Sequence, residues 1–242
     1  MDFLLDLNWL AIGQIILIDI LLGGDNAIVI ALACRNLPPH LRTKGILWGT
    51  AGAIGARIVL IAFAVTLLNL PYIKLLGGLL LFWIGVKLLA DNDGSHGEIA
   101  ASDRLMSAIK TIVVADLVMS VDNVIAVASV AEQAGGDHQL ALVIFGILVS
   151  IPIIVWGSTV VLKLMAKFPI IITLGAALLG YLAGGMIFTD AGLAPWLSAN
   201  LPPHEFVVPG VHLKLSMPGL IGAIGVVLAG TWLVKRARKS EQ

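Results

Sequence analysis

Long apolar stretches alternate with short polar breaks along the whole chain. A helix needs about 20 consecutive apolar residues to cross the hydrocarbon core of a membrane, and stretches near that length recur throughout the sequence. The breaks contain the charges, prolines and glycines that end or connect helices, as in "RNLPPHLRTK" and "DNDGSHGEIAASDR". The pattern predicts seven transmembrane helices, over about residues 9–34, 45–70, 72–90, 107–131, 140–163, 169–189 and 217–234.

The composition indicates the same surroundings for these helices. Hydrophobic residues make up 59% of the chain and charged residues 12%, whereas charged residues make up about 25% of an ordinary soluble domain. The mean hydropathy is +1.00. We therefore predict an all-α polytopic membrane protein within a lipid bilayer. The formal net charge is zero, so the total charge gives no sign of a nucleic-acid partner and we expect none.

Basic residues are unevenly distributed between the two sides of the predicted bundle. When the breaks are assigned alternately to the two sides, nearly all lysines and arginines fall together, and only Lys74 and Lys214 fall on the opposite side. Because cytoplasmic loops are enriched in basic residues, the N-terminus and the segment 190–216 are predicted to be extracytoplasmic and the C-terminus cytoplasmic. The basic side comprises Arg35, Arg42, Lys44, Lys87, Arg104, Lys110, Lys163, Lys167, Lys235, Arg236, Arg238 and Lys239.

Acidic and amide residues interrupt the first predicted helix in the stretch "DILLGGDNAIVIALA", residues 19–33. A carboxylate at the centre of a membrane helix costs about 2.5 to 3.5 kcal/mol, so its presence suggests a functional site. The fourth predicted helix has the same pattern 97 residues later, in "DLVMSVDNVIAVASV", residues 116–130. The matched polar residues are Asp19, Asp25 and Asn26 in the first helix and Asp116, Asp122 and Asn123 in the fourth.

The match between these stretches extends to the helices that follow them. "WGTAGAIG" and "FGILVSIP" share a glycine at the same offset, and "LGGLLLFWIG" resembles "LGAALLGYLAG" with one residue inserted. An odd number of helices in each copy places the second copy upside down, so we predict an inverted 3+3 helix repeat, a recurrent transporter plan, plus one C-terminal helix. The predicted units are residues 1–104 (first repeat), 105–189 (second repeat) and 190–242 (outer loop, last helix and tail).

The spacing of the polar residues predicts a break in the first helix. In a regular helix Asp19 and Asn26 share one face, and Asp25 joins them only if the helix is locally unwound. Gly23 and Gly24 permit such unwinding. Unwound carbonyl groups beside carboxylates and carboxamides form the oxygen-rich site that a hard divalent cation needs. Alternatively such residues only hydrogen-bond helices together, with about 0.6 to 2 kcal/mol per bond, but six of them in two matched copies favour a site.

The paired motifs resemble the two signature segments of the TerC/Alx family of bacterial integral membrane proteins, and the resemblance covers essentially the whole chain. It implies export of a divalent metal, chiefly manganese, across the bacterial cytoplasmic (inner) membrane. The acidic residues of the two matched helices would then form the metal site. Some relatives are instead tied to tellurite resistance, alkaline stress or supply of metal to secreted enzymes, and the sequence does not choose among these.

The available ligands bear on the identity of the metal. No Cys or His lies at the depth of the motifs, which argues against a site for zinc or copper. Met119 lies on the stripe shared by Asp116 and Asn123, and a thioether among oxygen ligands would favour Mn²⁺ or Fe²⁺ over Mg²⁺ and Ca²⁺. Its counterpart in the first repeat is Leu22, so the alternative role of Met119 is packing alone.

Arg57 lies in the middle of the second predicted helix, and the matching place in the second repeat, near Ile154, is apolar. A guanidinium at this depth needs an anion, and the candidates are Asp25, Asp19 and Asp116. Such a pair either holds the metal-free site together and breaks when metal binds, or it is a permanent structural pair.

The sequence also limits the source of energy for transport. It has no G-x-x-x-x-G-K-[ST] stretch for binding nucleotide phosphates. We therefore predict a secondary transporter that exchanges the metal for protons, with no permanently bound cofactor and no enzymatic activity. Two alternatives remain open. An intramembrane aspartyl protease would use one aspartate from each of two helices, and an exporter of amino acids or other small solutes would need a wider, less acidic cavity.

Overall fold

The computed structural model describes residues 13, 16–17, 24–62, 70–91, 101–134, 139–200, 205–208 and 213–240. Within these ranges, the side chains of residues 61–62, 122–134, 139–143, 198, 205–208, 213–214 and 237–240 lie outside the description. The long elements are α3 (Gly24–Cys34), α4 (Pro39–Ala62), α6 (Ile73–Ala90), α7 (Ala101–Ala134), α8 (Gln139–Lys167), α9 (Ile170–Phe188) and α11 (Met217–Ser240). The short ones are α10 (Ala194–Asn200), β1 (Glu205–Val208) and β2 (Leu213–Ser216).

Within the described part of the chain, four helices are long and apolar enough to cross a membrane. They are α6, residues Ile144–Lys167 of α8, α9, and residues Met217–Arg236 of α11, while α3 is a shorter apolar helix. This confirms a helical, polytopic membrane protein. The other three predicted spans, 9–34, 45–70 and 107–131, each include residues or side chains outside the description. The total of seven spans therefore stays a prediction.

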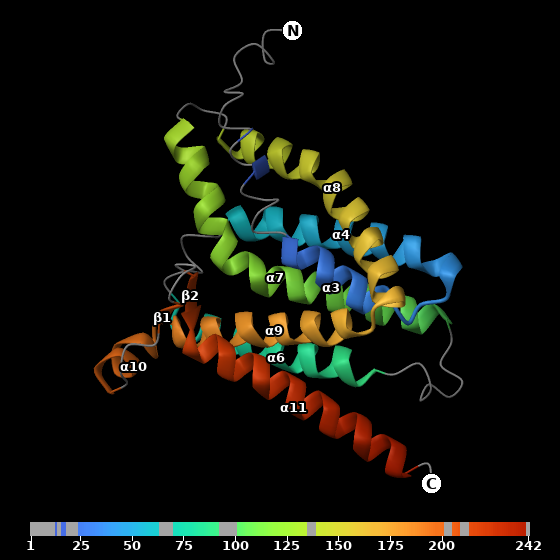
Figure 1. Ribbon diagram of the computed structural model, residues 1–242. Helices are drawn as coiled ribbons and strands as arrows, with labels where there is room; N and C mark the ends of the chain where they lie inside the picture. Colours follow the sequence, from blue (N-terminus) through green and yellow to red (C-terminus); the bar gives the residue numbers. More distant parts are fainter. Residues whose placement is uncertain are drawn as a thin grey trace, which may run out of the picture.

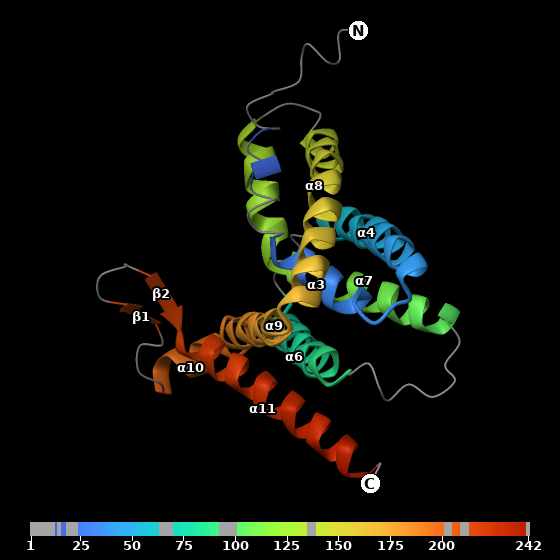
Figure 2. The same cartoon turned by 45° about the vertical axis from the view of Figure 1, so that its right-hand side comes forward.

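The helices pack in two groups that share an interface (Figures 1 and 2). In one group α4 lies along α7, and α3 packs against α8. In the other group α6, α9 and α11 pack against one another. Contacts of α6 with α7 and of α3 with α9 join the two groups. The second half of α7 turns away from the direction of its first half (Figure 1).

Glycines bring α9 and α11 into backbone contact. A Cβ atom added at Gly180 would collide with the backbone of Gly222, and one added at Gly184 would collide with the backbone of Pro218. Small residues four apart allow this close approach, which is how membrane helices gain packing energy without a hydrophobic driving force. The result is a firmly joined α9–α11 pair.

Three predicted breaks contain more structure than the sequence suggested. In "RNLPPHLRTK" the turn is confined to Arg35–Pro38 and α4 starts at Pro39, because proline fits the first helical position, where its missing N–H is not needed. The polar residues before the fourth span form the first turns of α7, from Ala101. The segment 190–216 contains α10 and an antiparallel hairpin that pairs Glu205 with Ser216. The fold is therefore all-α except for this small hairpin.

A buried carboxylate at the end of α9 fixes the start of α6. Asp190 is fully buried and accepts backbone N–H bonds from Tyr72 (3.0 Å), Lys74 (3.1 Å), Leu75 (3.1 Å) and Gly192 (2.8 Å). It thus caps the first turn of a helix more than 100 residues away in the sequence. Tyr72 has a left-handed φ of 68°, and the bond to Asp190 holds its backbone in this uncommon conformation.

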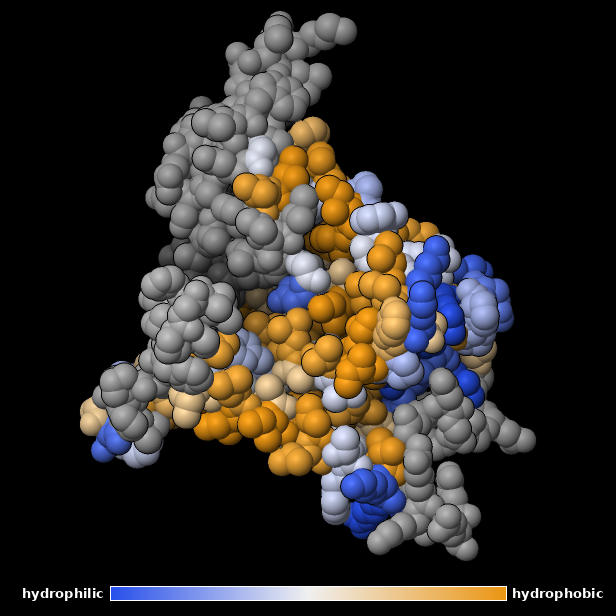
Figure 3. All heavy atoms as spheres, viewed as in Figure 1, coloured by the Kyte–Doolittle hydropathy of each residue, from blue (hydrophilic) through white to orange (hydrophobic). Residues whose placement is uncertain are grey.

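The outer surface is largely apolar, as lipid contact requires. Large apolar side chains such as Trp48, Leu76, Trp156, Ile221 and Leu228 are exposed. On the face shown in Figure 3 apolar residues form a broad area, and hydrophilic residues gather toward one end, near the α3–α4 turn and the C-terminal end of α11.

Candidate metal site

The α3 helix presents two residues of the first motif in its first turn. It begins at Gly24, directly before Asp25 and Asn26, and Asp25 Oδ1 accepts the backbone N–H of Asn26 at 2.9 Å. Asn26 is only 3% exposed, and its carboxamide nitrogen and oxygen have no hydrogen-bond partner among the described residues. A buried amide without partners is uncommon and costs about 1 to 3 kcal/mol, so Asn26 is a candidate ligand.

Periodicity directs Asn26 toward the interior of the first helix group. Asn26, Ile30 and Cys34 are spaced by four residues and share one face of α3. Ile30 and Cys34 belong to a buried cluster that includes Ala53 from α4 and Ile112 from α7. Asn26 therefore faces the junction of α3, α4 and α7.

A second buried polar group lies where α4 meets α7. Arg57 Nη2 donates to Asp116 Oδ1 at 2.5 Å, and Arg57 Nε donates to Ser120 Oγ at 2.9 Å. The Ser120 hydroxyl in turn donates to Asp116 Oδ2 at 3.2 Å. Arg57 is 4% exposed, Asp116 is 7% exposed and Ser120 is fully buried. We call this group the Arg57–Asp116–Ser120 triangle.

Small residues explain how α4 and α7 approach closely enough for this contact. A Cβ atom at Gly49 would strike Ile112, and one at Gly52 would strike Val113. Further along the same parallel pair of helices, Arg57 reaches Asp116. Of the three aspartates expected as partners of Arg57, the structure thus brings Asp116 to it. A buried ion pair of this kind is tolerated only when further hydrogen bonds satisfy it, and Ser120 supplies them.

The residues of the two helices lie near one another. The α3 helix, with Asp25 in its first turn, packs against both α7 and α4, the helices of Asp116 and Arg57. The described part of the chain contains no group of three His, Cys, Asp or Glu residues close enough to hold a metal. Asp19 lies outside the described residues, and Asp122 and Asn123 lie on α7 with side chains outside the description. Convergence of all six motif residues, and the break at Gly23, therefore stay predictions.

Met119 packs among apolar side chains. Its side chain is 6% exposed and belongs to an apolar cluster with Leu81 of α6 and Ala183 and Met186 of α9. This position supports the packing alternative for Met119, and its role as a ligand stays a prediction.

Sequence reasoning missed Ser120. Its counterpart in the first repeat is Gly23, so comparison of the two copies gave no signal. The available signal was its spacing of four residues after Asp116, which places both on one face of α7.

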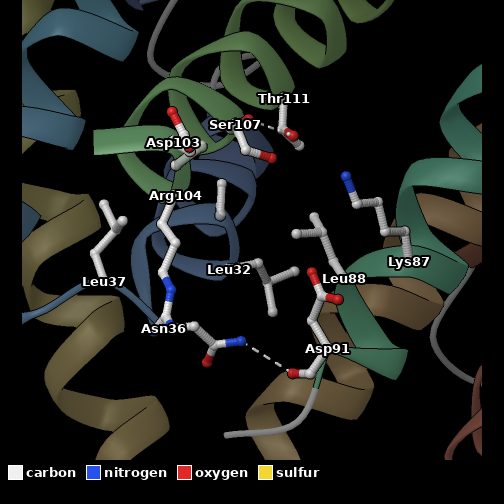
Figure 4. Close-up of a pocket in the computed structure, with 12 residues that line it drawn as sticks. Leu32, Asn36, Leu37, Lys87, Leu88, Asp91, Asp103, Arg104, Ser107 and Thr111 are labelled. Atoms are coloured by element: carbon white, nitrogen blue, oxygen red, sulfur yellow. Dashed lines mark hydrogen bonds between the residues drawn. The ribbon is translucent and has the colours of Figure 1, made fainter. Parts of the chain in front are cut away.

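A cavity of about 220 Å³, lined by both polar and apolar side chains, opens where α3 and α6 end and α7 begins. In Figure 4, Lys87 and Asp91 extend from α6 toward Ser107 and Thr111 of α7, and Asn36 donates to the Asp91 carbonyl at 3.0 Å.

The cavity and Asp116 lie on the same stripe of α7. Its lining residue Ala108 shares a stripe of α7 with Ile112 and Asp116, and eight residues of helix span about 12 Å. Ile112, which is 1% exposed, is the residue of that stripe that separates the cavity from Asp116.

These features define a helical integral membrane protein with carboxylates buried inside its helix bundle. The chain matches the family described as "Integral membrane protein TerC family" over residues 5–239, and it belongs to this family. The match confirms the resemblance seen in the paired motifs.

Relatives of the chain are membrane proteins. "Uncharacterized membrane protein YjbE" of Bacillus subtilis (strain 168) is 44% identical over 185 residues, which cover 76% of this chain and 81% of YjbE. YceF of the same organism is 30% identical over 136 residues, 52% of each chain. "UPF0053 inner membrane protein YgdQ" of Escherichia coli (strain K12) is 32% identical over 142 residues, 52% of this chain and 60% of YgdQ. No solved structure matches the chain.

Proposed function

We propose that this protein is a secondary transporter that exports a divalent metal ion, with Mn²⁺ as the favoured substrate, from the cytoplasm. The observation that carries the proposal is the buried Asn26 amide, which has no hydrogen-bond partner among the described residues and follows Asp25 in the first turn of α3. The α3 helix packs against α7, the helix that carries Asp116. Carboxylate and amide oxygens suit a hard divalent cation. Asp19, Asp122 and Asn123 complete the proposed site, whose ligands come from the first and fourth predicted spans.

The packing of the helices supports an inverted repeat. If α3, α4 and α6 correspond to α7, α8 and α9, each contact should recur with its partners exchanged. The contact of α3 with α8 then matches that of α4 with α7, and the contact of α6 with α7 matches that of α9 with α3. The α11 helix stands outside the repeat and packs on α6 and α9. In this arrangement the two motif helices, α3 and α7, meet at the centre.

The distribution of charge supports an orientation in the membrane. Basic residues lie at the α3–α4 turn, in the first turns of α7 and at the end of α11, which would all be cytoplasmic. The cavity lined by Lys87, Asp91 and Asp103 would then face the cytoplasm and give metal its route toward Asp116. The name of YgdQ, an inner membrane protein, supports the same membrane for this chain.

Proton exchange is the proposed source of energy. A metal ion binds carboxylates only in their ionised form, so metal and protons compete for one site. A site loaded with metal on the cytoplasmic side would release it outside, where the proton concentration is normally higher. Rocking of one repeat against the other would expose the site alternately.

The contacts of Asp116 favour transport over proteolysis. In an aspartyl protease two carboxylates share one proton, whereas Asp116 is bound to a guanidinium at 2.5 Å.

The proposal is tested by replacing the carboxylates and measuring cellular manganese. Asp25→Asn and Asp116→Asn keep the side-chain shape and remove the charge, so each should raise manganese content and sensitivity to manganese in cells that lack other exporters. Arg236→Gln, which removes an exposed charge on α11 away from the proposed site and cavity, is the control and should behave like the wild type. Unchanged manganese handling by both site variants, at matched protein level in the membrane, would refute the proposal. Peptide cleavage or amino-acid efflux that depends on the same residues would point to the alternatives.

A further inference from the structure

We infer that Arg57 is a counter-ion built into the transporter, which neutralises Asp116 while the protein reorients without metal. This inference rests on the proposed metal transport and concerns the return half of its cycle. It also gives Ser120 a role as a positioning residue for the guanidinium.

The geometry shows that Asp116 is fully engaged by the triangle. One carboxylate oxygen binds Arg57 at 2.5 Å and the other accepts from Ser120 at 3.2 Å. The Ser120 oxygen also accepts from Arg57 Nε at 2.9 Å, so one hydroxyl orients both charged partners. Because a metal ion and the guanidinium are both positively charged, a metal ion that binds Asp116 competes with Arg57 for the same carboxylate.

The contact between Arg57 and Asp116 matters most when the transporter has released its metal. A carboxylate left without a cation inside the bilayer costs several kcal/mol. With Arg57 in place, the pair carries no net charge, and the protein can reorient without an unpaired carboxylate at Asp116.

The position of the pair distinguishes it from an ordinary structural bridge. Arg57 belongs to α4 and Asp116 to α7, which are assigned to different repeats, so the bond crosses the boundary that moves during alternating access. The matching residue in the second repeat, Ile154, is 8% exposed and packs in an apolar cluster. Arg57 therefore has no basic counterpart in the second repeat, as expected for a side chain that balances the charge of a single carboxylate, Asp116.

Two flux measurements separate the halves of the cycle. The full-length protein is reconstituted in sealed vesicles at equal pH on both sides. Exchange is measured with saturating Mn²⁺ on both sides and a radioactive manganese tracer on one. Net flux is measured with Mn²⁺ on one side only. Exchange needs no reorientation without metal, whereas net flux does.

Arg57→Gln should keep exchange within about threefold of the wild type and lower net flux at least tenfold. Arg57→Lys retains a cation and should keep both fluxes within a few-fold. Ser120→Ala should lower net flux by about two- to fivefold and leave exchange unchanged. Arg236→Gln removes an exposed arginine on α11 and is the matched control, with both fluxes unchanged.

The outcomes distinguish this inference from the proposed function. Absence of manganese exchange in the folded wild type would refute the proposed function itself. Normal net flux in Arg57→Gln, or equal loss of both fluxes in folded protein, would overturn the counter-ion role alone. If Arg57→Gln does not fold, the wild type decides: net flux should lie within about threefold of exchange, and a net flux more than tenfold slower than exchange would overturn the inference.

Discussion

Two buried carboxylates, Asp116 inside the bundle and Asp190 at the end of α9, are stabilised by different kinds of partner. Asp190 receives four hydrogen bonds from backbone N–H groups of α6 and its own turn. Asp116 receives its bonds from two side chains, Arg57 and Ser120. Both residues are less than 10% exposed. Both regions therefore stabilise a buried carboxylate. The partners of Asp190 are fixed backbone groups, whereas those of Asp116 are side chains that can move.

The difference indicates what each carboxylate can do. Backbone N–H groups cannot leave without unfolding the first turn of α6, so Asp190 is suited to joining α6 and α9 permanently. A guanidinium on a flexible side chain can rotate away when another cation arrives. Asp116 is therefore suited to exchange, which is the role that we propose for it, whereas Asp190 has a structural one.

Breaking the Arg57–Asp116 pair from one side should have the largest effect on stability. Arg57→Leu leaves a buried carboxylate without its cation, so we expect a loss of about 3 to 5 kcal/mol. The double variant Arg57→Leu with Asp116→Leu removes both charges and should recover most of this stability, while metal transport stays lost. Thermal unfolding in detergent measures both variants. A double variant as unstable as the single one would remove the contrast with Asp190, because the pair would then be a structural requirement.

Asp190→Ala should have the next largest effect, about 3 kcal/mol, because it leaves several backbone N–H groups without partners. Asp190→Asn keeps one acceptor oxygen and should lie between the alanine variant and the wild type. No second substitution can restore this loss, since the partners are backbone groups. Hydrogen exchange at the start of α6 provides the local measurement, and unchanged protection there in Asp190→Ala would contradict the capping role.

Acid should weaken the Asp190 contact in a defined range. Asp190 lies in the turn after α9, outside the membrane-spanning segments. Burial alone would raise the pKa of its carboxyl, but the N–H groups of Gly192, Leu75, Tyr72 and Lys74 outweigh burial and hold the pKa below its ordinary value of 3.8.

The sign follows from linkage. A lowered pKa in the folded state contributes stability that is present above pH 3.8 and is lost as the pH falls through the folded-state pKa. Unfolding of wild type and Asp190→Asn, compared from pH 6 down to pH 2, should therefore converge at the acid end. A difference that stays constant over this range would show that the charge of Asp190 adds nothing.

Ser120→Ala should have the smallest effect on stability, about 1 kcal/mol, because it removes one hydroxyl while the ion pair remains. The matched control is Ser158→Ala, since Ser158 is equally buried but donates only to the Ile154 carbonyl of its own helix. The two variants should differ little in thermal stability and clearly in net metal flux. Equal flux in both would separate Ser120 from the function of the triangle.

The sequence predicts most of the apolar helices but few of the contacts and polar turns at the helix ends. The apolar runs at 72–90, 169–189 and 217–234 correspond to α6, α9 and α11. Most of the predicted ends lie within a few residues of the ends in the structure. Polar first turns, such as those of α4 and α7, were assigned to loops because hydropathy does not distinguish a solvated helix end from a loop.

The candidate site was predictable only in part. Matched motifs indicated Asp25, Asn26 and Asp116, and the need of Arg57 for an anion was clear from its depth. Ser120 and Asp190 escaped notice because their partners are set by tertiary packing: Ser120 by the approach of α4 to α7, and Asp190 by the end of α9 meeting the start of α6. Local pattern carries no trace of these contacts between helices, and the spacing of Ser120 from Asp116 was the only local signal.

Manganese flux in sealed vesicles tests the central claim most directly. Purified protein is reconstituted with a metal-sensitive dye trapped inside, and a pH gradient is imposed with and without a protonophore. Wild type should move Mn²⁺ against the direction of proton flow, the protonophore should remove the drive, and Asp25→Asn should show no flux above protein-free vesicles. Manganese flux of equal rate in wild type and Asp25→Asn, or no flux through folded wild-type protein in either direction, would contradict the account.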